Sequence, residues 1–177
     1  MSGMKHEIIL VTGGVKSGKS SLALKMAEKQ AESGAFIATA TAGDEEMERK
    51  IAAHRQERGP GWCTYEEPRS LAARIEAAAA RYDIVLVDCL TMWVSNLLTL
   101  YGLERNEVLD ECARTVSALD RAPAPVILVT NETGMGIMPP DSLSRTFHDL
   151  LGKLNRDVAG IAASVIFMVS GIPLKIK

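Results

Sequence analysis

The sequence predicts one α/β domain with a mostly parallel, doubly wound β-sheet, that is, a sheet with helices on both faces. Short runs rich in Val, Ile and Leu alternate with longer segments of helical periodicity, which is the pattern of a parallel sheet. The strongest runs, at residues 8–12, 84–88 and 126–130, are almost entirely apolar, as strands buried on both faces are. With 177 residues and no repeat or linker, residues 1–177 are expected to form a single domain.

The first third of the chain is expected to alternate strands with helices. Residues 8–12 are predicted as a strand and residues 20–33 as a helix that Gly34 stops. Residues 36–40 are predicted as the next strand. The acids at 44–46 are expected to begin a helix, because negative charge stabilises a helix N-terminus. Glycine and proline at 59–61 should end this helix at about residue 58.

The rest of the chain continues the alternation. The periodicity predicts a short strand at 62–66, a helix at 69–80, a strand at 84–88, helices at 92–100 and 106–120, a strand at 126–130, a loop at 131–140, a helix at 142–163 and a last strand at 165–169. The glycines and prolines of the loop suit either a substrate-side surface or a plain structural turn.

Composition excludes several classes of protein. Twenty Lys and Arg against 22 Asp and Glu give a net charge of −2, which supplies no field for a nucleic-acid partner. No apolar stretch is long enough to span a membrane, and the N-terminus lacks the features of a signal peptide. The three cysteines are odd in number and lack zinc-ligand spacing, so reduced thiols in a cytoplasmic protein are expected.

A phosphate-binding motif lies between the first predicted strand and helix. Residues 13–20 fit G-x-x-x-x-G-K-[ST], the phosphate loop (P-loop) of nucleoside triphosphatases, so the expected fold is a RecA-like P-loop domain. Its glycines let backbone N–H groups converge on phosphate oxygens. Lys19 supplies a charge for the β- and γ-phosphates and Ser20 a hydroxyl for Mg²⁺. The whole motif is expected to contact nucleotide: Gly13, Gly14, Val15, Lys16, Ser17, Gly18, Lys19 and Ser20.

Asp88 closes a strand of four aliphatic residues and resembles a Walker-B acid, a carboxylate placed near Mg²⁺. Strand-terminal acids are common, and the P-loop is what favours the functional interpretation. The motif does not decide the reaction. Regulatory GTPases read guanine with Asn-Lys-x-Asp after an apolar strand, whereas residues 130–133 read Thr-Asn-Glu-Thr, which disfavours a Ras-like switch.

His54 has two interpretations. It shares a helical stripe with Met47 and Ile51, which is typical of a half-buried core histidine. However, Arg55 and Arg58 lie within one turn, and nearby positive charge lowers the pKa of an imidazole. A neutral histidine at pH 7 is a competent nucleophile. His6 and His148 are expected to be structural or solvent-facing.

Four segments, at residues 10–20, 37–39 with 45–55, 129–139 and 169–177, resemble the bifunctional adenosylcobinamide kinase/adenosylcobinamide-phosphate guanylyltransferase family of cobalamin biosynthesis. The resemblance implies phosphorylation of adenosylcobinamide by a nucleoside triphosphate (ATP or GTP), followed by transfer of GMP from GTP to adenosylcobinamide phosphate. The family forms a GMP–histidine intermediate, and the matching residue is His54, with Lys19 as the second catalytic residue. The family also implies a homotrimer.

The family's nucleotide contacts carry over, besides the P-loop, to Ile37, Ala38, Thr39, Arg55, Gln56, Glu57, Arg58, Glu66 and Asp88, with Mg²⁺ held by Ser20 and Asp88. Residues 1–7 extend beyond the family's usual start and are expected to be dispensable. From the residues alone, two other functions stay open: a small-molecule P-loop kinase without a covalent step, and a nucleotide-binding regulatory protein.

Overall fold

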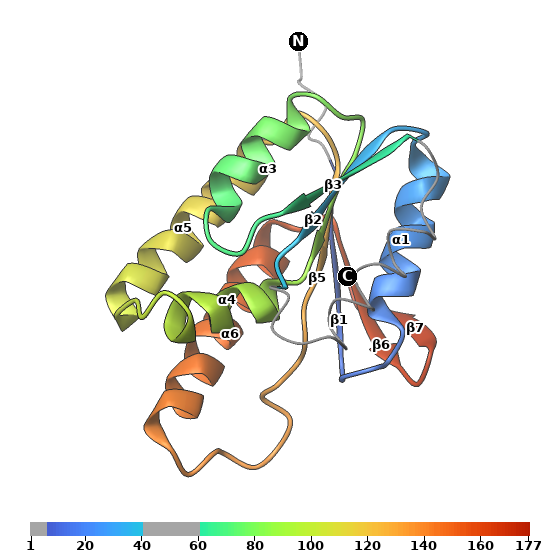
Figure 1. Ribbon diagram of the computed structural model, residues 1–177. Coiled ribbons are helices and arrows are strands. Elements are labelled where there is room, and N and C mark those ends of the chain that lie inside the picture. The colour runs from blue at the N-terminus through green and yellow to red at the C-terminus, as the bar shows by residue number, and fades with distance from the viewer. Residues whose placement is uncertain (1–6, 41–60) are drawn as a thin grey trace, which may run out of the picture.

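The computed structural model describes residues 7–40 and 61–177 (Figure 1). The expected helix at 44–58 and the site residues His54, Arg55, Gln56, Glu57 and Arg58 lie outside the described residues. Residues 1–6 of the N-terminal extension lie outside them as well. Glu7 is described, and its backbone carbonyl accepts a hydrogen bond from the Val126 N–H at 3.0 Å. Residue 7 is therefore hydrogen-bonded to the sheet, and dispensability of residues 1–7 stays a prediction.

A seven-stranded sheet with strand order β3-β2-β4-β5-β1-β6-β7 forms the centre of the described structure. Six strands pair in parallel and the last pairs antiparallel with β6, so the predicted mostly parallel sheet is confirmed. The strands are β1 (Ile8–Gly13), β2 (Gly34–Ala38), β3 (Trp62–Glu66), β4 (Val85–Asp88), β5 (Val126–Val129), β6 (Ser164–Val169) and β7 (Ile172–Lys175).

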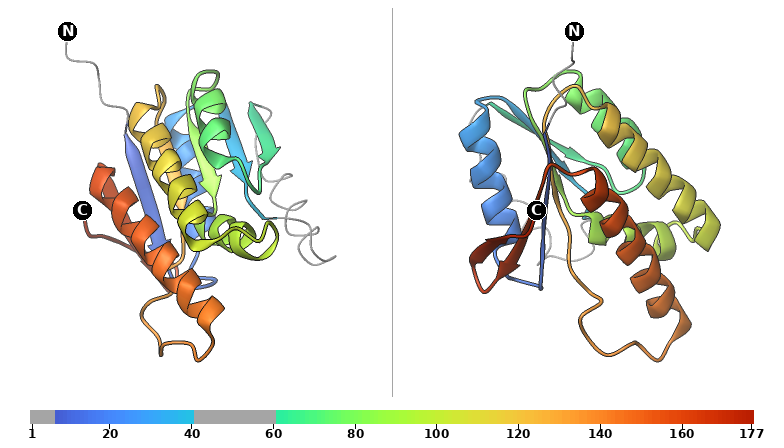
Figure 2. Two further views of the ribbon diagram at one scale, coloured as in Figure 1. Left: turned by 90° about the vertical axis from the view of Figure 1, so that its left-hand side faces the viewer. Right: turned by 180° about the vertical axis from the view of Figure 1, so that it is seen from behind.

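Helices cover both faces of the sheet, which confirms the doubly wound architecture (Figures 1 and 2). Alternate residues of β1 point to opposite sides: Leu10 packs in a core with α3, α4, α5 and α6, while Ile9 and Val11 pack in a core with α1. The helices are α1 (Lys19–Gln30), α3 (Leu71–Ala79), α4 (Leu90–Thr99), α5 (Arg105–Arg121) and α6 (Ser142–Ile161). No helix within the described ranges is long and apolar enough to cross a membrane.

The first helix ends earlier than its composition predicts. It stops at Gln30 rather than at residue 33, and Gly34 begins β2 instead of ending the helix. The physical reason for the glycine is packing: a Cβ at position 34 would lie 2.6 Å from ring atoms of Trp62 on neighbouring β3. Gly34 therefore serves the close approach of two strands, which a one-dimensional pattern does not reveal.

The antiparallel strand β7 was not predicted. Ser170 and Gly171 have φ of 49° and 84°, so two successive left-handed residues connect β6 to β7 in a tight hairpin. Pro173 and the exposure of all four β7 residues suit an edge strand, which gives no alternation of buried and exposed positions. The pair Ser170-Gly171 was the sequence signal that could have indicated this hairpin.

Candidate nucleotide-binding site

The backbone of the P-loop adopts positive φ angles at the positions where it turns. Gly13, the last residue of β1, has φ of 143°, and a Cβ there would collide with the backbone oxygen of Met168 on β6. Gly18 has φ of 93° and forms the N-cap of α1, and Lys16 adopts φ of 56°. The loop therefore curls between β1 and α1 so that the N-terminus of α1 faces the space it encloses, an arrangement that suits an anion.

The hairpin formed by β6 and β7, here called the terminal hairpin, contacts and stabilises this loop. The Gly171 N–H in the β6–β7 turn donates to the backbone oxygen of Ser17 at 3.0 Å. A Cβ on Gly18 would lie 3.5 Å from Met168 Cε and 3.7 Å from Gly171 Cα, so the loop and the hairpin are in contact. The Ser17 hydroxyl is buried and has no hydrogen-bond partner within the described structure. A polar group of this kind is available to a ligand that enters the loop.

Lys19 lies inside the loop and not on its surface. Its side chain is 7% exposed, and its Nζ donates to the backbone oxygen of Gly14. Burial lowers the pKa of this ammonium below its usual value, while electrostatic interactions with the side chains of Cys89 and Asp88 oppose the shift. The structure therefore brings Lys19 and Asp88, 69 residues apart in sequence, within electrostatic reach of one another.

Further predicted site residues lie at the carboxyl ends of three neighbouring strands, along one edge of the sheet. Ala38 of β2 pairs with Glu66 of β3 on one side and with Asp88 of β4 on the other, so the carboxyl ends of these strands are level. Ligands of open parallel sheets bind outside this edge. The Ile37 side chain is fully buried and Ala38 is 6% exposed, so these two residues present only their backbone to a ligand.

Thr39 holds two of these strand ends together. Its hydroxyl accepts a hydrogen bond from the Cys89 N–H at 2.8 Å and donates to the Cys89 carbonyl at 2.7 Å. Its own N–H donates to the Asp88 carbonyl at 3.0 Å, and the Asn96 amide donates to the Thr39 carbonyl at 2.7 Å. The fully buried Thr39 side chain therefore fixes the backbone on which Asp88 is mounted.

Replacing Thr39 by valine is expected to destabilise the fold by about 2 kcal/mol, because both polar groups of Cys89 would lose their buried partner. Urea denaturation of the two proteins measures the difference. Thr99→Val is the control, since the Thr99 hydroxyl donates to the Ser95 carbonyl on the exposed surface of α4, and a change within about 0.5 kcal/mol is expected there. Equal stability of Thr39→Val and the wild type would contradict the bracing role of Thr39.

A buried network of polar side chains lies after β5, at the same edge of the sheet. This network was not predicted from the sequence. The Thr91 hydroxyl accepts from the Asn131 N–H at 2.7 Å, and the Thr130 hydroxyl donates to Asn155 Oδ1 at 2.8 Å. The Asn155 amide then donates to the Asn131 carbonyl at 3.1 Å. This network fixes the segment after β5 next to the P-loop, where the Glu132 N–H donates to the Gly13 carbonyl at 3.1 Å.

The arrangement as a whole combines a P-loop, an acid at the end of β4 and a fixed polar segment after β5. A family described as cobinamide kinase / cobinamide phosphate guanyltransferase matches residues 9–176. The chain belongs to this family. The resemblance found in the sequence is thereby confirmed, and the match spans both the P-loop and the terminal hairpin.

Curated members of the cobinamide kinase / cobinamide phosphate guanyltransferase family match the chain at nearly full length. It is 42% identical over 172 residues to the bifunctional adenosylcobalamin biosynthesis protein CobP of Pseudomonas aeruginosa, covering 95% of this chain and 96% of that protein. It is 39% identical over 181 residues to the bifunctional adenosylcobalamin biosynthesis protein CobU of Escherichia coli, covering 96% and 99%. The corresponding CobU of Salmonella typhimurium is 40% identical over 181 residues, with the same coverage.

Solved structures support the RecA-like P-loop fold. The flagellar accessory protein FlaH of Methanocaldococcus jannaschii superimposes with a TM-score of 0.54 at 12% identity, over 97% of this chain and 78% of that chain. The KaiC-like protein PH0186 of Pyrococcus horikoshii gives a TM-score of 0.52 at 16% identity, over 91% of this chain and 70% of that chain. At these identities the similarity concerns the fold alone.

Proposed function

We propose that the chain phosphorylates adenosylcobinamide with ATP or GTP and then transfers GMP from GTP to the phosphate it has made. The observation that carries this proposal is the family match over residues 9–176, combined with a P-loop in which Lys19 lies near Asp88. The products of the second reaction are adenosylcobinamide-GDP and pyrophosphate. This function places the protein in cobalamin biosynthesis, in agreement with the names of its relatives.

Nucleotide binding is assigned to the P-loop and the edge formed by β2, β3 and β4. Backbone N–H groups of residues 13–20 and the N-terminus of α1 would bind the phosphates, and Lys19 would neutralise charge on the β- and γ-oxygens. Residues 37–39, Glu66 and Asp88 lie along the neighbouring strand ends, where the nucleoside would extend.

The residues fit a magnesium ion. Mg²⁺ prefers oxygen ligands and takes one or two carboxylates besides phosphates and waters. Ser20 is half-buried in the first turn of α1, and Asp88 is half-buried at the end of β4, so both offer hard oxygen donors near the P-loop. Bound by them, Mg²⁺ would neutralise phosphate charge. The described residues contain no cluster of three or more His, Cys, Asp or Glu side chains that would hold a metal ion without phosphate.

His54 is proposed as the nucleophile of the second reaction. An imidazole nitrogen attacks the α-phosphorus of GTP and forms a P–N bond while the bond to the pyrophosphate oxygen breaks. A phosphate oxygen of adenosylcobinamide phosphate then attacks the same phosphorus, and the P–N bond breaks. Lys19 would stabilise the departing pyrophosphate, and Arg55 and Arg58 would stabilise the charge on the α-phosphoryl group.

Incubation with α-labelled GTP, followed by denaturing electrophoresis and peptide mapping, tests this assignment. The wild type is expected to carry acid-labile GMP on the peptide that contains His54, and His54→Ala is expected to lose the label and the guanylyl transfer while keeping phosphorylation. His6→Ala in the N-terminal extension is the control and should be labelled normally. Label retained by His54→Ala would exclude this residue as the nucleophile, and an unlabelled but phosphorylating wild type would indicate a kinase without a covalent step.

The family resemblance also supports a homotrimer, and the odd number and wide spacing of the cysteines support a cytoplasmic location. A net charge of −2 agrees with the proposal that the protein has no nucleic-acid partner.

A further inference from the structure

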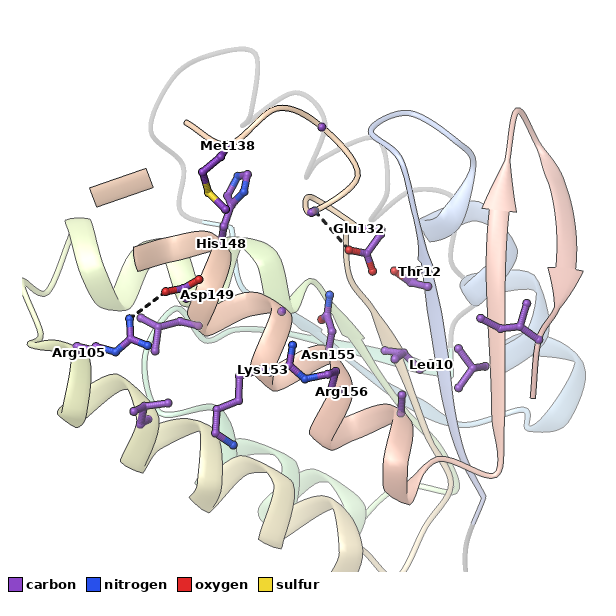
Figure 3. A pocket seen from close by; sticks show the side chains of 18 residues that line it. Leu10, Thr12, Arg105, Glu132, Met138, His148, Asp149, Lys153, Asn155 and Arg156 are labelled. Atoms are coloured by element: carbon purple, nitrogen blue, oxygen red, sulfur yellow. Dashed lines mark hydrogen bonds and ion pairs between the residues drawn. The ribbon is translucent and has the colours of Figure 1, made fainter. Parts of the chain in front are cut away.

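A cavity of about 580 Å³ lies beside the P-loop, on the sheet face covered by α5 and α6 (Figure 3). Its walls are the end of β1, helices α5 and α6, and the loop at residues 131–140, which contributes Glu132, Gly134 and Met138. The volume is that of a small-molecule site. The nucleotide contacts implied by the sequence resemblance include none of the residues after Asp88, so nothing assigned so far accounts for this cavity.

Glu132 joins the cavity to the P-loop. Its backbone N–H donates to the carbonyl of Gly13, the first residue of the P-loop, at 3.1 Å. Its side chain lines the cavity, and Figure 3 shows the carboxylate directed toward the Thr12 hydroxyl at the end of β1. The Thr12 hydroxyl is buried and has no hydrogen-bond partner in the described structure. The Glu132 carboxylate and the Thr12 hydroxyl therefore lie on the wall of the cavity where Thr12 precedes Gly13, the first residue of the P-loop.

The Glu132 carboxylate is available as a proton acceptor. One of its oxygens, Oε1, accepts the Gly134 N–H at 3.3 Å, and no cation among residues 7–40 and 61–177 forms an ion pair with it. A carboxylate that is not neutralised by a cation is the better base.

The other acid that lines the cavity is placed differently. Asp149 forms an ion pair with Arg105 at 3.3 Å, on the side of the cavity formed by α5 (Figure 3). Asp88 is separated from the P-loop strand β1 by β5 and is proposed to hold Mg²⁺. Of the two acidic residues that line the cavity, Glu132 is therefore the one that is hydrogen-bonded to the P-loop.

We propose that the cavity receives the hydroxyl-bearing arm of the phosphate acceptor and that Glu132 is the general base of the kinase step, an inference that rests on the proposed kinase function. The acceptor hydroxyl oxygen forms a bond to the γ-phosphorus, and the bond between that phosphorus and the β,γ-bridging oxygen breaks. The electron pair leaves with the nucleoside diphosphate. The hydroxyl proton passes to a carboxylate oxygen of Glu132 and from there to water.

The loop that carries Glu132 also suits a large acceptor. Met138 lines the cavity and is 60% exposed, and Met135 and Ile137 on the same loop are 76% and 97% exposed, so the loop presents an apolar rim. Methionine adapts its shape to irregular apolar surfaces. The arm would enter the cavity while the apolar parts of the acceptor contact this rim.

Glu132→Gln tests the role of the base. The glutamine oxygen can still accept the Gly134 N–H, so the loop should keep its structure. The kcat of phosphorylation is expected to fall by about 10²–10⁴-fold, with the KM for ATP unchanged. Guanylyl transfer to supplied cobinamide phosphate should stay within about threefold of the wild type, because the base acts only on the hydroxyl.

The conservative variant adds a readout that separates a base from a structural group. Glu132→Asp keeps a carboxylate and should phosphorylate at a rate between those of the wild type and of Glu132→Gln, with the KM for ATP unchanged. Glu111→Gln on the outer surface of α5, where Glu111 pairs with Arg114, is the matched control and should retain wild-type kinetics.

Two results would overturn the inference while leaving the proposed function intact. One is a kinase kcat of Glu132→Gln within about threefold of a wild type that phosphorylates cobinamide. The other is an equal loss of ATP binding and of both reactions in Glu132→Gln and Glu132→Asp, which would mark a structural role. A wild type that transfers no phosphate to cobinamide would overturn both the proposed function and the role of Glu132.

Discussion

Lys19→Met is expected to lower the turnover of both reactions by about 10²–10³-fold, the cost of removing one preorganised donor to developing charge. Both reactions use the same phosphates, so a single substitution should impair both. Lys19 is 7% exposed in the wild type, and burial lowers the pKa of its ammonium, which means that the charged form costs the folded protein free energy. The variant should therefore be at least as stable as the wild type. Steady-state kinetics of the two reactions and thermal unfolding measure these quantities.

Lys25→Met on the exposed side of the same helix is the matched control and should keep both activities. If Lys19→Met bound and turned over nucleotide as the wild type does, the P-loop would not be the nucleotide site. Loss of only one activity would mean that the two reactions use different nucleotide sites.

Gly13→Ala is expected to lower the free energy of unfolding by about 3 kcal/mol, since the new Cβ would collide with the Met168 backbone while φ is positive. Backbone in the middle of a sheet cannot move aside as a flexible side chain can. For a chain of this size the loss corresponds to a fall in Tm of roughly 6–12 °C. Nucleotide affinity should fall with it, because the first turn of the P-loop would be displaced. Calorimetry and nucleotide titration provide the measurements.

Gly14→Ala is the control for stability, because a Cβ at position 14 would meet no atom of residues 7–40 and 61–177 within 4 Å. Its Tm should stay close to that of the wild type. Equal Tm values for Gly13→Ala and the wild type would show that β1 and β6 are packed less closely than the structure indicates.

Most of the fold could be predicted from the sequence because its local signals agree with one another. Apolar runs at β1, β4 and β5 are buried at every aliphatic position, and the P-loop motif lies between a strand and a helix as expected. The role of Gly34 was predicted wrongly, and strand β7 was not predicted. In both cases the deciding interaction joins distant parts of the chain or lies at a solvent-exposed edge, where hydrophobic periodicity carries no information.

The candidate site could be predicted only where a motif carries it. The sequence singles out the P-loop and Asp88, and in the structure Lys19 and Asp88 interact electrostatically. Their roles in binding nucleotide and Mg²⁺ stay predictions. The roles proposed for His54, Ser20 and the strand-end residues stay predictions. Glu132 was part of a segment recognised as characteristic of the family, yet its place beside Gly13 depends on β5 lying next to β1. Strand order of this kind is a property of the folded sheet.

The contact between the terminal hairpin and the P-loop has a consequence for synthesis of the protein. The P-loop is encoded near the start of the chain, but β6 and the turn that donates to Ser17 come more than 140 residues later. A nascent chain that ends before residue 171 cannot make this contact, so the P-loop should gain its support from the hairpin only after the hairpin has left the ribosome. Nascent chains that lack the hairpin are therefore expected to bind nucleotide more weakly than chains that contain it.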